Sequence, residues 1–396
     1  MKYTLKWAAA IALAAAAGLA SAQEIRIAHV YGKTGALEAY AKQSHTGFMM
    51  GLEYATHGTM KVLGRKIVVI EKDTQLKPDI GKSLLAAAYG DDKADIAVGP
   101  VSSGVALAML PVAEEYKKIL LVEPAVADSI TGANWNRYIF RTSRNSTQDG
   151  LAAAATLKGD ISIATLAQDY AFGRDGVKAL KDALAQVGSK AKIVHEEYAP
   201  QKTTDFTAPA ERIFAALKDR PGRKVLAIIW AGPNPVTKIA ALDPGRFGIE
   251  LAPGGNILPV MKGWKDLAGV EGAIYYYYGF PKNKMNDWLV KEHEKRYGIP
   301  PDFFTCGGMA AAVAVVDAIR KAHGTDTEKL ISAMEGMSFD TPKGKMTFRK
   351  EDHQAMQDMF EFRIKPASKQ KNEWDLLDLV RVIPASELPV PIANKR

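Results

Sequence analysis

Short apolar runs alternate with longer amphipathic segments over the first third of the chain. Apolar runs typical of buried strands lie at residues 24–30, 65–70, 95–98 and 119–122, and segments with helical periodicity lie at 37–54, 80–89 and 103–116. Strands that alternate with helices in sequence form parallel sheets covered by helices on both faces. The pattern therefore predicts an α/β unit in this part of the chain.

The same rhythm restarts after Arg141, Thr142 and Ser143. It predicts strands at 161–166, 191–195 and 225–230, helices at 174–187 and 206–217, shorter strands at 256–260 and 273–277, helices at 285–297, 304–323 and 329–334, and a strand-like tail at 344–384. We therefore expect a second α/β unit. Ligands of open α/β sheets bind beyond the carboxyl ends of the strands, so the loops at those ends are the candidate site.

The first 22 residues have the pattern of a cleaved export signal. Lys2 and Lys6 precede an apolar run at 7–19, and Ala20-Ser21-Ala22 is a cleavage site of small residues. The run is too short to span a membrane stably, although a buried N-terminal helix is an alternative interpretation. We expect residues 1–22 to be a signal peptide, and the mature protein to reach the periplasm without inserting into the membrane.

Composition narrows the class of protein. A chain of 396 residues with 47% hydrophobic and 24% charged residues is typical of a soluble protein of two domains. Two of its eight net positive charges lie in the leader, and the others are spread without an arginine-rich arm, so we expect no nucleic-acid partner. Cys306 is the only cysteine, which excludes an intramolecular disulfide and is interpreted as a small buried residue rather than a nucleophile.

The sequence does not match the enzyme motifs that its loops first suggest. The Gly32-Lys33-Thr34 loop lacks the earlier glycine of a phosphate-binding loop, because Ile27 stands at that position, and no dinucleotide-binding glycine motif follows a strand. The serines at 102 and 103 do not fit a nucleophile elbow, and the seven histidines are scattered. We therefore expect no enzyme, no cofactor and no metal; a secreted α/β hydrolase that uses Ser102 or Ser103 is the alternative from another class.

Two loops of small residues remain. One, Gly99 to Ser103, leads into a helix that begins near Ser103, and the free N–H groups and positive dipole end of that helix suit a carboxylate. The other, Glu123 to Ser129, follows the next strand at the same sheet edge, so its backbone N–H groups could converge on the same anion. A plain N-capping role for Ser102 or Ser103 is an equal alternative.

The order of five segments is similar to that of the periplasmic receptors for branched-chain amino acids, type I solute-binding proteins of ABC importers. The five segments are Gly99–Ser103, Glu123–Asp128, Phe140–Ser143, Asp169–Gly173 and Gly344–Phe348. The resemblance implies two Rossmann-like lobes with parallel-type sheets, joined by a three-stranded crossover hinge that closes on a ligand. It implies lobe 1 at 23–142 plus 279–338, lobe 2 at 143–278 plus 339–396, and a membrane permease as partner.

The resemblance also implies a ligand site. It assigns the carboxylate to Ser103, Ala125 and Ala127, and the aromatic pocket positions to Tyr40 and Phe172. Further candidates from the same loops and strand ends are Val101, Ser102, Val126, Tyr170, Trp230, Asn234 and Met261. Core packing is an equal alternative for Trp230, and a buried crossover strand is the preferred interpretation of the tyrosines at 275–278.

Two departures from the family pattern concern the ligand. Ala127 stands where amino-acid receptors usually have a threonine, and Val260-Met261-Lys262 contains no acid for a ligand ammonium. A buried ammonium without a carboxylate is costly. We therefore expect a small carboxylate without an α-ammonium, such as an aromatic or aliphatic acid. A branched-chain amino acid receptor and a ligand-sensing subunit remain alternatives within the fold.

Overall fold

The computed structural model describes residues 24–394, so the expected signal peptide at 1–22 lies outside the described residues. The first sheet has the strand order β2-β3-β1-β4-β5-β6, and every pair in it is parallel except β2 with β3. Its strands are β1 (Ile25–Tyr31), β2 (Lys61–Val62), β3 (Arg65–Asp73), β4 (Ile96–Val98), β5 (Leu120–Val122) and β6 (Ile139–Arg141).

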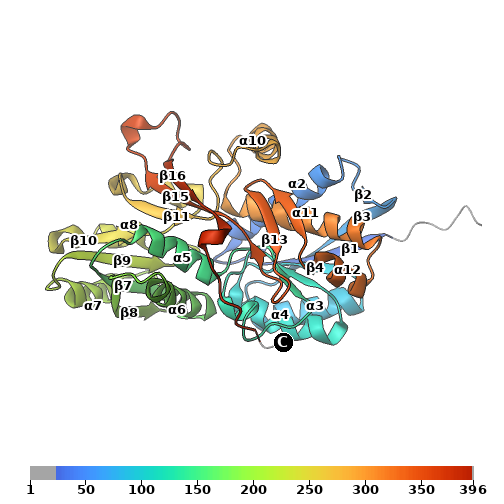
Figure 1. Cartoon of the computed structure of the whole chain (residues 1–396), viewed down its shortest axis with the longest axis horizontal. Coiled ribbons are helices and arrows are strands. Elements are labelled where there is room, and N and C mark those ends of the chain that lie inside the picture. The colour runs from blue at the N-terminus through green and yellow to red at the C-terminus, as the bar shows by residue number, and fades with distance from the viewer. Residues whose placement is uncertain (1–23, 395–396) are drawn as a thin grey trace, which may run out of the picture.

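Helices cover both faces of this sheet. They are α2 (Glu38–Ala55), α3 (Pro78–Gly90), α4 (Ser103–Tyr116) and α11 (Phe303–Ala322). Outside them, α10 (Lys284–Tyr297) packs on α2 and α11, and α12 (Thr327–Met334) packs on α11. The pair α3 and α4 packs together, as does the pair α2 and α11, and Figure 1 shows the two pairs on opposite sides of β1 and β4. The first unit is therefore an α/β layer structure, and it recruits α10 to α12 from late in the chain.

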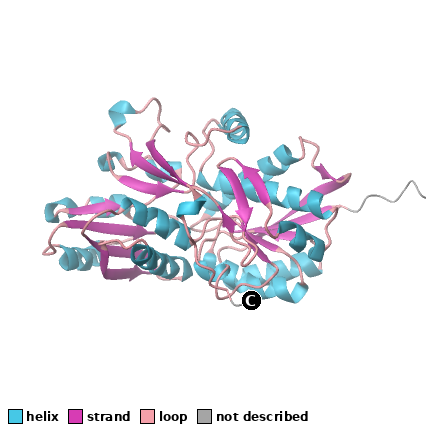
Figure 2. Cartoon of the chain, in the orientation of Figure 1, coloured by secondary structure: helices cyan, strands magenta, loops and turns pink. Residues whose placement is uncertain are grey.

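The second unit is built on a parallel sheet of order β10-β9-β7-β8. Its elements are β7 (Ile161–Gln168), β8 (Lys192–Ala199), β9 (Arg223–Ile229), β10 (Ile249–Ala252), α5 (Ser146–Thr156), α6 (Ala171–Gln186), α7 (Thr207–Leu217), α8 (Val236–Ala240) and α9 (Leu258–Met261). Helices α5 and α6 pack against each other, while α7 packs on β7 and β8. Figure 2 shows the same layering of strands and helices in both units.

Two small antiparallel sheets complete the chain, with orders β11-β15-β16 and β12-β13-β14. Their strands are β11 (Glu271–Ile274), β12 (Ser338–Thr341), β13 (Gly344–Phe348), β14 (Ala355–Met356), β15 (Met359–Ile364) and β16 (Leu377–Ile383). Phe360 and Phe362 of β15 belong to the hydrophobic core of the second unit, whereas Phe339 and Phe348 belong to that of the first. We therefore propose lobe limits in which residues 339–355 join lobe 1.

Most predicted elements occur close to their expected limits, and several regions differ. The strand expected at 273–277 ends at Ile274, so the tyrosines at 275–278 lie outside a strand. The strand expected at 256–260 is a turn that leads into α9, because Pro259 lies inside the first turn of a short helix. The edge strand β10 and helix α5 were not expected. Within residues 24–394, α11 is the one helix long and apolar enough to cross a membrane; 89% of its apolar window is buried between other elements, as in a core helix.

Candidate functional site

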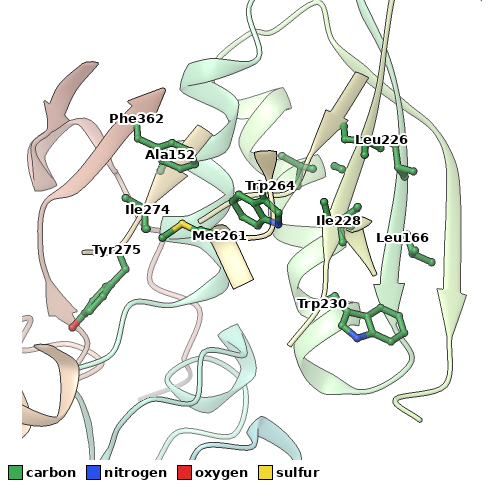
Figure 3. Packing of buried hydrophobic residues seen from close by; sticks show 14 of the residues in the cluster. Ala152, Leu166, Leu226, Ile228, Trp230, Met261, Trp264, Ile274, Tyr275 and Phe362 are labelled. Atoms are coloured by element: carbon green, nitrogen blue, oxygen red, sulfur yellow. The ribbon is translucent and has the colours of Figure 1, made fainter. Parts of the chain in front are cut away.

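A cavity of about 600 Å³ lies where the two units meet. The first unit contributes the start of α4 with Ser103, and the start of α11 with Phe303 and Phe304. The second unit contributes Trp230, which follows the last residue of β9, and Tyr275, which follows β11. Figure 3 shows Trp230 at the end of its strand. The site thus lies at the carboxyl ends of strands, as expected for an α/β fold.

Ser103 supplies the polar corner on the first unit. It is 2% exposed, lines the cavity, and its Oγ accepts a hydrogen bond of 3.2 Å from the N–H of Ala127. Ser102 is the N-cap residue of α4, but its side chain makes no capping bond and it does not line the cavity. The first-turn N–H groups of α4, which have no partner within the helix, therefore remain available for an anion.

The loop after β5 is arranged differently from the expectation. The N–H of Ala125 donates to the carbonyl oxygen of Pro100 at 3.2 Å, and the N–H of Ala127 donates to Ser103, so these two amides are engaged within the protein. Neither Ala125 nor Ala127 lines the cavity, whereas Val126 and Val101 do. The two alanines therefore position Ser103 and the loop instead of facing the space themselves.

Arg144 lines the cavity and was not among the expected site residues. Its side chain is 12% exposed, its Nε donates to Oδ1 of Asp149 at 3.1 Å, and its guanidinium lies 4.7 Å from the centre of the Phe303 ring. Its place directly after the Arg141-Thr142-Ser143 crossover was the available signal. A guanidinium held in this way presents its remaining N–H donors in a fixed position on the cavity lining.

Asp149 lies deep in the molecule, yet its side chain stays 37% accessible because it faces the cavity. The loss of bulk water around it raises the pKa of its carboxyl above the usual value, and the charge and hydrogen bond of Arg144 offset part of that shift. The pair places one positive and one negative group at the start of α5.

Aromatic rings form one wall of the cavity. Ring centres are 4.4 Å apart for Tyr40 and Phe304, 4.8 Å for Phe303 and Phe304, and 5.1 Å for Tyr275 and Phe303. Tyr170 lines the opposite unit's side together with Phe172, at 5.9 Å between ring centres. Such faces can contact the ring of a ligand from two sides.

Tyr40 also ties the two units together. Its hydroxyl donates to Oδ1 of Asn256 at 3.1 Å and accepts from the N–H of Gly232 at 3.0 Å, and both partners belong to the second unit. Nearby, Asp302 at the start of α11 accepts from the N–H of Leu258 at 2.8 Å. The structure therefore holds the two units in contact beside the cavity.

Of the three remaining candidates, one lines the cavity and two do not. Trp230 lines the cavity and also packs edge to face on Phe206 at 5.1 Å, so both interpretations of this residue apply. Asn234 does not line the cavity; its Oδ1 accepts from the N–H of Val236, the first residue of α8, at 2.9 Å. Met261 does not line it either. It belongs to the same hydrophobic cluster as Trp264, and Figure 3 shows both side chains between Ile274 and Ile228.

The chemistry of a hydrolase is poorly supported by these surroundings. The cavity lining, as described for residues 24–394, contains no histidine that could serve Ser103 as a base. Burial raises the pKa of the Cys306 thiol, which disfavours the thiolate form. No group of three or more histidine, cysteine, aspartate or glutamate side chains among the described residues could hold a metal ion. The arrangement is suited to binding.

Known proteins share this architecture along nearly the whole chain. A solved ABC-type branched-chain amino acid transporter protein from Rhodopseudomonas palustris CGA009 is 61% identical, with a TM-score of 0.82 over 94% of this chain and 100% of that one. A solute-binding protein from R. palustris BisB5, solved with 3,4-dihydroxybenzoic acid, is 25% identical, with a TM-score of 0.79 over 92% and 98% of the two chains. The Leu/Ile/Val-binding protein homolog 6 of Brucella melitensis is 25% identical over 91% of this chain and 92% of its own.

These findings confirm the expected fold class, two α/β lobes of a type I periplasmic binding protein, and the expectation that the chain is not an enzyme. Proteins of this kind are the periplasmic solute-binding components of ABC transporters, which bind small molecules and interact with membrane permeases. The periplasmic binding protein family matches residues 24–371, and this chain belongs to that family.

Proposed function

We propose that this protein captures a carboxylate that lacks an α-ammonium group, for uptake by an ABC importer. The single observation that carries the proposal is the pairing of the acids around the cavity. Asp149 pairs with Arg144, Glu250 with Arg223, and Glu271 with Arg363. Because each cavity-lining acid already has an arginine, none is left over to neutralise a ligand ammonium.

The same cavity offers groups for the other charge. Arg144 pairs with Asp149 through its Nε, so its Nη groups would act as hydrogen-bond donors to the carboxylate, together with the Ser103 hydroxyl and the first turn of α4. The rings of Tyr40, Phe303 and Phe304 would contact the body of the ligand. The benzoic acid derivative in the R. palustris BisB5 protein supports this class of ligand. The names of other relatives favour a branched-chain amino acid receptor as the second candidate.

A thermal-shift screen separates the two candidates. Benzoate, hydroxybenzoates and short alkanoates would be compared with leucine, isoleucine and valine. A ligand present at about 100 times its dissociation constant stabilises a protein by about 2.7 kcal/mol, which is an easily visible shift of melting temperature. We expect the acids without an amino group to stabilise the protein and the amino acids not to do so; the opposite ranking would refute the proposal.

Replacement of Ser103 tests the proposed carboxylate contact. Ser103→Ala should weaken the binding of the best acid by about 1–3 kcal/mol, because the buried anion loses a hydroxyl donor. Ser102→Ala is the matched control, since this neighbour lies in the same turn but outside the cavity lining. Isothermal titration calorimetry measures both. Equal affinities for the two variants would restrict Ser103 to its bond with Ala127.

We also propose that residues 1–22 are removed on export, so that the mature chain begins at Gln23. Lys2, Lys6 and the small residues at 20–22 support this proposal. Mass spectrometry of protein recovered from the periplasm would show a mature mass that starts at Gln23. A chain retained in full would contradict the cleavage.

A further inference from the structure

The cavity does not end at the aromatic wall; it continues through the second lobe. Its lining includes residues of β9 from Arg223, the first residue of the strand, to Trp230 just beyond the last. At about 3.3 Å per residue, this path is more than 20 Å long. A volume of about 600 Å³ also lies well within the range of about 300–1,000 Å³ found for sites of drug-sized ligands. The space exceeds what a single-ring acid needs.

Helix α5 lines this space along its whole length. Ser146, Asp149, Ala153 and Thr156 recur every three or four residues and share one face of the helix. Ala153 is only half-buried although it lies inside the lobe, because it faces the cavity. The face is charged at Asp149, near the aromatic wall, and uncharged from Ala153 onwards, where the Thr156 hydroxyl donates to the carbonyl oxygen of Ala153 at 2.8 Å.

The opposite wall explains why the space exists. Val225, Ala227 and Ile229 alternate along β9 and line the cavity. The neighbouring strand β10 does not pair with β11, which belongs to a different sheet. Small residues in and just after these strands line the cavity, including Ala252, Gly255, Gly272 and Ala273, and the N–H of Gly255 donates to the carbonyl oxygen of Ala273 at 3.0 Å. The far end is charged and exposed, with an Arg223–Glu250 ion pair of 2.8 Å.

We propose that the ligand is an elongated carboxylic acid, whose alkyl or arylalkyl tail occupies this apolar channel between α5 and β9. This inference rests on the proposed carboxylate site and extends it. The head group lies at Ser103 and Arg144, and the tail runs along Ala153, Ala227 and Leu157. The charged residues at the far end set the limit of the tail, since an alkyl chain gains nothing beside Arg223 and Glu250.

A homologous series tests the channel directly. Butanoate, hexanoate, octanoate and decanoate would be titrated into the full-length mature protein by calorimetry. A buried methylene contributes about 0.8 kcal/mol, so Kd should fall about fourfold for each methylene until the channel is full. The heat-capacity change of binding should become more negative with each step, because apolar surface is buried. A Kd that stays flat or rises beyond butanoate would overturn the channel proposal.

A variant whose larger side chain fills the channel provides a second test. Ala153→Leu should leave butanoate affinity within about twofold and abolish the gain from octanoate and decanoate. Ala155→Leu is the matched control, because the same change on the same helix lies outside the lining. A gain that survives in Ala153→Leu would mean apolar binding elsewhere and would refute the channel.

The outcomes also separate this inference from the proposed function. Binding of butanoate and benzoate with no dependence on chain length would leave the carboxylate site standing and refute only the channel. No binding of any acid, with binding of leucine, would refute both. If Ala153→Leu fails to fold, as shown by circular dichroism, the wild-type series with its heat-capacity trend still decides the question.

Discussion

Both lobes place small residues between a helix and its neighbour, with opposite results. In lobe 1, a Cβ added at Gly47 would lie 1.9 Å from the carbonyl oxygen of Thr305, and one added at Gly308 would lie 2.0 Å from that of Ser44. Helices α2 and α11 therefore touch backbone to backbone. In lobe 2, a Cβ added at Gly150 of α5 would also lie 2.8 Å from the carbonyl oxygen of Ala179 in α6, but Ala153 of the same helix faces an open channel. The space that small side chains leave is filled by a neighbouring helix at Gly47, Gly308 and Gly150, and stays open at Ala153.

The difference follows from how freely the element packed against each helix can approach it. Helix α11 arrives from late in the chain as a separate element and can approach α2 until the backbones meet. Helix α5 faces strands of two different sheets, and the hydrogen bonds of each sheet hold these strands in place. Close packing is thus expected of lobe 1 and a rigid, preformed channel of lobe 2.

The largest expected effect comes from Gly308→Ala. The added methyl group would overlap the carbonyl oxygen of Ser44, so α2 and α11 must separate, at a cost of about 3 kcal/mol or more in the free energy of unfolding. Urea unfolding measures it. Gly104→Ala is the control, because its Cβ would meet only the Oγ of Ser102 at 4.0 Å, and helical alanine is more stable than glycine by about 0.5–1 kcal/mol. An unchanged free energy of unfolding in Gly308→Ala would contradict the close backbone contact between α2 and α11.

Two buried ionisable groups, Glu123 and Lys343, contrast with the open channel. Glu123 follows β5, is 2% exposed and accepts from the Thr142 hydroxyl at 3.1 Å. Burial raises its pKa from 4.5 to about 7. Lys343 is 5% exposed, its Nζ donates to Oε1 of Gln357 at 3.0 Å, and burial lowers its pKa from 10.5 to about 7. Unlike the channel, the surroundings of Glu123 and Lys343 are filled with protein, and burial disfavours the charged forms of both groups.

The second prediction concerns the pH dependence of stability. The folded state holds the proton of Glu123 more tightly than the unfolded state does, so this group's stabilisation is lost as pH rises from about 4.5 to about 7. Glu123→Gln should remove that loss, which is roughly 3 kcal/mol at about 1.4 kcal/mol per pKa unit. Lys343→Met is the opposite control, because the pKa of Lys343 is lowered and its contribution recovers from about pH 7 to 10.5. Parallel pH curves for wild type and Glu123→Gln would contradict the assignment.

The alternation of strands and helices could be predicted from sequence because apolar periodicity and capping residues act locally. Helix α4 begins and ends where expected, at Ser103 and Tyr116. Helix α5 was missed because its alanine-rich run has no clear apolar face; the Asn145 and Gln148 capping box was its available signal. The apolar run at 256–260 reads equally as strand or short helix, and tertiary context decided for α9.

The site was harder to predict than the fold. Ser103, Tyr40 and Phe172, which the family resemblance proposed as ligand contacts, line the cavity. Ala125 and Ala127 instead donate their N–H groups in hydrogen bonds within the protein. The channel had no sequence signal, because alanines that leave an open space look the same as alanines that another element covers. The cavity lining along α5 and β9 distinguishes the two cases in the structure.

The smallest expected effect concerns Lys262, from the Val260-Met261-Lys262 segment that contains no acid. It pairs with Glu373 at the surface of lobe 2, with side-chain exposures of 43% and 59%, and it does not line the cavity. An exposed pair contributes about 0–1 kcal/mol, so Lys262→Ala should change the free energy of unfolding by less than about 1 kcal/mol and leave the affinity for acids unchanged. Titration of the best acid into Lys262→Ala and Arg144→Lys makes the contrast, because only the second change touches the cavity. A loss of affinity in Lys262→Ala would move the anion site out of the channel entrance and toward the outer face of lobe 2.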